Sequence, residues 1–131
     1  MKSRLIYWLT YAGMWLLALL PFKVLYILSD GLCFLMHHVV HYRRRVVRAN
    51  LCNAFPEKSA AELRDIEREF YRYICDYMLE EVKMLRMSFK ELCRRMEYDN
   101  KEEYLAMIEK HGGIVLLIPH YANFEWITGM S

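Results

Sequence analysis

Residues 114–125 read Ile-Val-Leu-Leu-Ile-Pro-His-Tyr-Ala-Asn-Phe-Glu, and this stretch decides the fold that the sequence predicts. The unbroken run of β-branched residues and leucines at 114–118 is typical of a strand buried on both faces of a parallel sheet. The residues before it predict a helix that runs to about Lys110 and is stopped by two glycines. Residues 123–131 predict the next helix, with Asn123 as a candidate N-cap. We therefore expect an α/β fold, mostly helical in these 131 residues, with 114–118 as its first core strand.

This strand would deliver His120 to its tip, with Glu125 five residues further on. In a continuous helix, side chains five apart point about 140° away from each other, so the two would not meet. If the helix begins near Asn123, the turn brings Glu125 back to the imidazole, where a carboxylate fixes the tautomer and stabilises the imidazolium. No Ser or Cys lies between residues 114 and 124, so the simplest nucleophile is a substrate hydroxyl that His120 deprotonates. A purely structural histidine at a strand end fits the spacing as well.

The N-terminal third of the chain predicts attachment to a membrane. Residues 5–22 form an uncharged segment that reaches the lower length limit of a transmembrane helix, and the apolar stretch 24–36 follows. Residues 1–55 carry seven Lys and Arg against one Asp, whereas residues 56–131 carry eleven against fifteen Asp and Glu. Because the basic half is also the apolar half, this layout favours a membrane surface and not nucleic acid. We expect residues 1–42 to be a membrane-associated helical anchor, either two helices broken near Pro21 or one spanning helix.

The middle of the chain predicts helices and a basic cluster. Arg43, Arg44 and Arg45 either contact phosphates of a lipid or substrate, or form a solvated face. Ser59 and Glu62 match a capping box, which begins a long helix. The apolar stripe along that helix predicts core packing; it comprises Leu63, Ile66, Phe70, Tyr73, Ile74, Tyr77, Met78, Val82 and Leu85.

Several landmarks together resemble one protein family. They are the apolar N-terminus with its Leu-Pro step, the arginine run, a segment that reads Ala-Asn-Leu-Cys-Asn-Ala-Phe-Pro-Glu at 49–57, and residues 113–125 with a His-x₄-Glu pattern. The chain resembles the N-terminal part of a bacterial lipid A biosynthesis acyltransferase, the late-acting branch of the lysophospholipid acyltransferase superfamily.

The resemblance implies an enzyme on the cytoplasmic face of the bacterial inner membrane. It would transfer a fatty acyl group from an acyl carrier protein thioester to a hydroxyl of a lipid A precursor, without a covalent acyl-enzyme, metal or cofactor. By position, His120 is the general base and Glu125 its orienting partner, while Asn123 and Trp126 shape the substrate pocket. Residues 43–131 would be an incomplete acyltransferase domain, and we expect the chain to be inactive alone because one strand cannot bury two apolar faces.

Two other functions remain open on the sequence. The first is an acyltransferase for another membrane lipid, such as an amino-acid lipid or a lysophospholipid. The second is a non-catalytic membrane-bound protein that docks a partner through the apolar stripe between residues 63 and 85. Only an assay with defined acceptors separates the lipid A enzyme from the first alternative.

Overall fold

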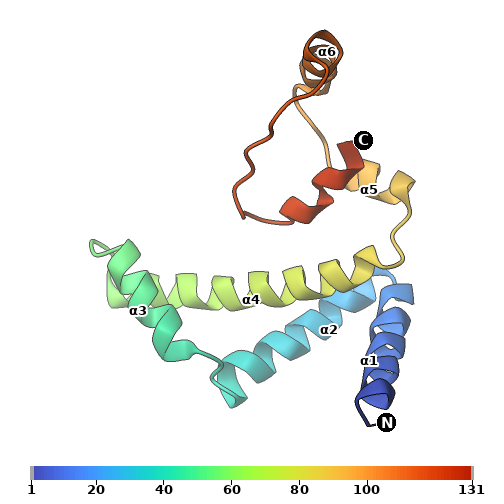
Figure 1. Cartoon of the computed structure of the whole chain (residues 1–131). Helices are drawn as coiled ribbons and strands as arrows, with labels where there is room; N and C mark the ends of the chain where they lie inside the picture. Colours follow the sequence, from blue (N-terminus) through green and yellow to red (C-terminus); the bar gives the residue numbers. More distant parts are fainter. Residues whose placement is uncertain (1, 131) are drawn as a thin grey trace. The chain divides into compact units, whose positions relative to one another are not determined.

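The computed structural model describes residues 2–130, with side chains through Ile127. It forms two compact units, Met1–Leu85 and Arg86–Ser131. The first unit contains five helical elements, which are α1 (Lys2–Leu19), α2 (Phe22–Phe34), the π-helical turn η1 (Leu35–Val39), α3 (Arg44–Ala54) and α4 (Ala60–Met84) (Figure 1). The second contains α5 (Phe89–Arg95), α6 (Lys101–His111) and the 3₁₀ helix η2 (Phe124–Met130). The predicted boundary after residue 42 concerns membrane attachment and stays a prediction.

The N-terminal apolar segment is broken at Pro21, as one of the two sequence interpretations expected. Helix α1 ends at Leu19, and the Pro21 carbonyl accepts the first backbone hydrogen bonds of α2, from the N–H groups of Val24 and Leu25. Within the described residues, one helical stretch is long and apolar enough to cross a membrane, judged by length and composition alone: Phe22–Val39. This stretch consists of α2 and η1, so it lies after the segment 5–22 that the sequence singled out.

Helix α4 begins with the predicted capping box. The Ser59 hydroxyl accepts from the Glu62 N–H, and the Glu62 carboxylate accepts from the Ser59 N–H at 2.8 Å. The face that α4 buries within its unit holds Glu67, Tyr71 and Cys75, which follow each other at four-residue steps. The predicted core stripe is a different face of the helix. Phe70, Tyr73, Met78 and Leu85 on this stripe stay between 39% and 48% exposed, whereas its other five members are half-buried, so the core prediction is wrong for these four.

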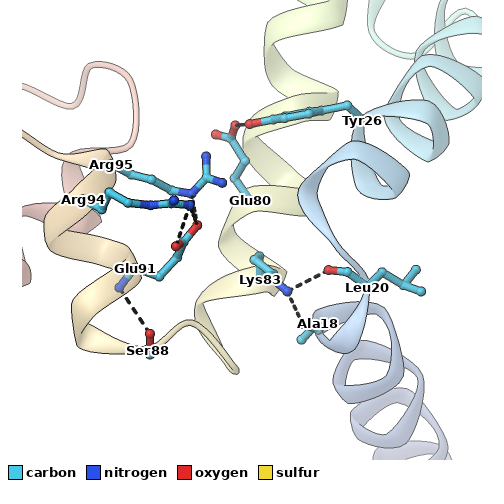
Figure 2. A network of polar contacts seen from close by, with 9 residues as sticks. All are labelled: Ala18, Leu20, Tyr26, Glu80, Lys83, Ser88, Glu91, Arg94 and Arg95. Carbon is cyan, nitrogen blue, oxygen red and sulfur yellow. Dashed lines mark hydrogen bonds and ion pairs between the residues drawn. The ribbon is translucent and has the colours of Figure 1, made fainter.

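Polar contacts fasten α4 to the two N-terminal helices (Figure 2). The Lys83 ammonium donates to the carbonyls of Ala18 and Leu20 at 2.8 and 2.7 Å. These carbonyls lie at the end of α1, where backbone acceptors have no partner inside the helix and a cation is favoured. The Tyr26 hydroxyl of α2 donates to the Glu80 carboxylate at 2.6 Å.

The two α-helices of the second unit begin in different ways. The Ser88 hydroxyl accepts from the Glu91 N–H at the start of α5, while the Glu91 carboxylate pairs with Arg94 and Arg95 (Figure 2). No side-chain cap from Asn100 starts α6. At the other end of α6, Gly112 adopts a left-handed φ of 74°, which stops the helix as expected.

The predicted strand at 114–118 is not present within residues 2–130, so the α/β prediction holds only in its helical part. Residues 113–119 have no regular secondary structure. A strand is stabilised by backbone hydrogen bonds to a neighbouring strand, and the described residues supply none. As a result Val115 is 91% and Leu117 90% exposed.

Candidate active site

His120 follows the exposed apolar segment and stands at a tight turn. The Tyr121 N–H donates to the Pro119 carbonyl at 2.8 Å, and Ala122 then adopts a φ of 52°. This left-handed conformation is disfavoured for a residue with a Cβ atom by roughly 1–2 kcal/mol. The chain therefore bends just before η2. The His120 ring is exposed and lies 4.4 Å, centroid to centroid, from the ring of Phe124.

Helix η2 begins at Phe124, one residue after the predicted N-cap. The Trp126 N–H donates to the backbone carbonyl of Asn123 at 3.0 Å. Trp126 is buried, whereas Asn123 and Glu125 are half-buried. The start of η2 thus gathers Asn123, Glu125 and Trp126 within one turn, close in sequence to His120.

Tyr98 holds η2 from the loop between α5 and α6. Its hydroxyl lies 3.4 Å from the carbonyl oxygens of Trp126 and Ile127, to which it donates. Burial raises the pKa of Tyr98, so the hydroxyl keeps its proton and remains a donor at neutral pH. Tyr98 could not be singled out from the sequence, since an isolated tyrosine gives no periodic signal.

The ring contact recorded for His120 is with Phe124 and not with Glu125. The turn at 119–122 and the helix start at Phe124 are the elements that the predicted pair requires. The predicted strand at 114–118 is not formed by the described residues, and the pairing of His120 with Glu125 stays a prediction.

The arginine run divides between two environments. Arg44 Nε donates to Glu67 Oε1 at 2.8 Å, whereas Arg43 and Arg45 are exposed. Arg43 precedes α3 with a left-handed φ of 50°. Arg44 therefore helps to hold α3 against α4, which leaves its two neighbours as the more accessible cations for a phosphate.

The partner of Arg44, a buried carboxylate on α4, was not predicted from the sequence. Glu67 is 2% exposed, and its other oxygen accepts from Arg48 Nε at 2.8 Å. His37 Nε2 lies 3.4 Å from Glu67 Oε1. Burial by itself raises the pKa of Glu67, but the hydrogen bonds and charges of Arg48 and Arg44 outweigh it and hold the pKa below its ordinary value. The available signal was the i,i+4 spacing of the two arginines, which places both on one face of α3.

Comparison with known proteins identifies the family. The model of the bacterial lipid A biosynthesis acyltransferase family matches residues 1–130. The chain is 28% identical over 122 residues to the lipid A biosynthesis lauroyltransferase of Escherichia coli (strain K12). This match covers 91% of the chain but 40% of the relative, so the chain spans less than half of the relative's length. No solved structure matches. The chain belongs to the bacterial lipid A biosynthesis acyltransferase family.

Proposed function

We propose that this chain supplies the membrane-associated segment and the first catalytic residues of a lipid A acyltransferase. The enzyme transfers a fatty acyl group from an acyl carrier protein thioester to a hydroxyl of a lipid A precursor. The observation that carries the proposal is the family match across residues 1–130, which includes the His-x₄-Glu segment at 120–125. The matched relative is itself a lipid A biosynthesis lauroyltransferase.

His120 acts as the general base in the proposed reaction. Its imidazole takes the proton from the acceptor hydroxyl as that oxygen attacks the thioester carbonyl carbon. The new C–O bond forms, the C–S bond breaks, and the imidazolium returns its proton to the departing thiolate. Glu125 holds the imidazole in the correct tautomer and stabilises its charged form. No acyl-enzyme is required, because the substrate hydroxyl is the nucleophile.

We propose that residues 114–118 pair as a strand once the rest of the sheet is present. Their exposed apolar side chains support this, since Val115 and Leu117 are about nine-tenths exposed in this chain. Pairing would place His120 at the strand end, and the turn at Ala122 would bring Glu125 back towards the imidazole. Asn123 and Trp126, at the start of η2, would then line the substrate pocket beside the pair.

The proposed location is the cytoplasmic face of the bacterial inner membrane. The apolar stretch Phe22–Val39 supports membrane attachment, and the exposed cations of Arg43 and Arg45 follow within six residues. These arginines are suited to the phosphates of the acceptor or of the surrounding lipid, because guanidinium groups bind phosphate with two parallel hydrogen bonds.

Acyl transfer tests the proposal in a protein of the relative's length that contains this chain, called the full-length protein below. His120→Gln and Glu125→Gln are compared with His111→Gln, an exposed histidine at the end of α6. Membranes with matched protein levels receive acyl carrier protein thioester and a lipid A precursor. We expect His120→Gln to lose about 10²–10⁴-fold in rate, which is the usual contribution of a general base. Glu125→Gln should lose less, and His111→Gln should keep its activity.

Three results would contradict the proposal. Transfer that survives His120→Gln would remove the base assignment. Equal losses in His120→Gln and His111→Gln would point to a general effect on folding. Transfer by the wild-type protein to an amino-acid lipid or lysophospholipid, with none to the lipid A precursor, would keep the chemistry and replace the substrate.

A further inference from the structure

An apolar groove runs between α3 and α4 in the first unit. Its volume is about 590 Å³, within the range of cavities that hold small ligands. The turn that leads into α3 is fastened to α4, because the Tyr71 hydroxyl donates to the Tyr42 carbonyl. The groove is therefore formed by elements that are already held together. It is lined by Met36, Tyr42, Arg43, Val46, Val47, Asn50, Phe70, Tyr71, Ile74, Tyr77 and Met78.

The groove begins where the candidate membrane stretch ends. Met36 belongs to Phe22–Val39 and also lines the groove, and Tyr42 and Arg43 follow the end of that stretch by three and four residues. Tyrosine and arginine are both favoured at the boundary between hydrocarbon and water, where the apolar part of the side chain is buried and its polar end is hydrated. A groove at this boundary is within reach of the upper part of a lipid acyl chain.

The charge of the groove favours an anionic occupant. Its lining residues include Arg43 and no Asp or Glu. Arg44 and Arg48 are engaged by Glu67, whereas neither Arg43 nor Arg45 makes an ion pair within the part of the chain that the structure describes. The local cations are therefore available to a phosphate, next to walls that suit an apolar chain.

We propose that this groove binds one acyl chain of an anionic phospholipid of the bilayer, with Arg43 contacting the lipid phosphate. The apolar side chains of α3 and α4 enclose the upper methylenes, and Arg43 selects lipids that carry net negative charge. The proposal concerns attachment to the membrane and does not rest on acyl transfer or on His120.

Photo-crosslinking of the full-length protein tests this groove. The protein is placed in phosphatidylcholine nanodiscs that contain a minor fraction of a lipid with a diazirine in its acyl chain, either phosphatidylglycerol or phosphatidylcholine. Adducts are mapped by mass spectrometry. We expect the phosphatidylglycerol probe to label Val46, Val47, Ile74 and Met78, and the phosphatidylcholine probe to label them several-fold less.

Two variants and one control separate charge from shape. Arg43→Asn removes the charge without adding backbone strain, since asparagine is enriched at positive φ, and it should lower phosphatidylglycerol labelling about fivefold. Val46→Trp fills the groove from a residue that is 43% exposed and should lower labelling by both probes. Arg64→Asn changes an exposed arginine of α4 outside the groove and should have no effect.

Either of two results would overturn the proposal. Labelling of α1 and α2 with none at the groove residues would mean that another part of the protein, or a protein partner, covers the groove. Equal labelling by the two probes, unchanged in Arg43→Asn, would mean that the groove does not select anionic lipid.

Discussion

The two compact units differ in how they accommodate residues that are costly to leave without partners. The first unit pairs its buried charges, whereas the second exposes an apolar run. In the first unit, the buried Glu67 carboxylate is met by Arg44 and Arg48, and the Lys83 ammonium is met by carbonyls at the end of α1. In the second unit, the most apolar run of the chain is left open to solvent. A helix satisfies its backbone from within, whereas a strand needs a neighbour that a distant part of a protein supplies. The helices of the first unit therefore satisfy their backbones within themselves, whereas we propose that the run at 114–118 needs a neighbouring strand.

The largest expected effect comes from a charge placed in the exposed apolar run at 114–118. Leu117→Asp should change the stability of this chain by less than about 0.5 kcal/mol, because the side chain is 90% exposed. In the full-length protein, the same substitution should cost more than about 3 kcal/mol if 114–118 is a buried strand, since an unpaired carboxylate would be desolvated. Denaturant unfolding of both proteins measures the difference. Equal, small effects in the two would contradict the predicted strand.

A substitution at Glu67 tests the buried charge pairing of the first unit. Glu67→Gln leaves Arg44 and Arg48 without their counter-charge and should destabilise the first unit by about 2 kcal/mol. The effect should be below the range for fully buried pairs, because the side chains of Arg44 and Arg48 are 29% and 49% exposed and become hydrated. Thermal unfolding in detergent, followed by circular dichroism, measures this loss. Glu69→Gln, an exposed residue of the same helix, is the matched control and should have little effect.

The same carboxylate predicts a pH dependence. The pKa of Glu67 lies below its ordinary value of 4.5 in the folded chain, so the unfolded chain binds the proton first as pH falls. This part of the stability is therefore complete above the ordinary value and is lost as pH falls through the lower, folded value. Wild type and Glu67→Gln should converge in stability under acidic conditions. A difference that stays constant down to acidic pH would contradict the assignment.

A smaller effect is expected where α4 meets the end of α1. Lys83→Met removes two charge-assisted hydrogen bonds to the carbonyls of Ala18 and Leu20, and should cost about 1–2 kcal/mol. Lys23→Met changes an exposed lysine of α2 and serves as the control in the same unfolding measurement. Equal losses in the two variants would show that the effect is one of charge alone.

Local signals in the sequence predicted most of the helical structure. The break at Pro21, the capping box at Ser59 and Glu62, and the stop at Gly112 each depend on a few neighbouring residues, and all three are present. Periodicity shows which face of α4 is apolar, and this face was therefore predicted to be core. Periodicity does not show what covers the face. Glu67 was missed because its partners lie 19 and 23 residues away on α3.

The turn of the candidate site could be predicted from the sequence, but the pairing of His120 with Glu125 could not. The two glycines indicated where α6 stops and Asn123 indicated where the next helix begins, and η2 begins one residue after Asn123. The approach of Glu125 to His120 is proposed to depend on pairing of 114–118 as a strand, which the described residues do not show. No local pattern determines that approach.

Amide hydrogen exchange at residues 114–118 tests the account most directly, because backbone protection reports strand pairing without reference to activity. Exchange is compared between this chain and the full-length protein, with α4 as an internal reference in both. We predict fast exchange at 114–118 in this chain, slow exchange in the full-length protein, and slow exchange in α4 throughout. Fast exchange at 114–118 in the full-length protein, beside a protected α4, would contradict the claim that this run becomes the strand that holds His120.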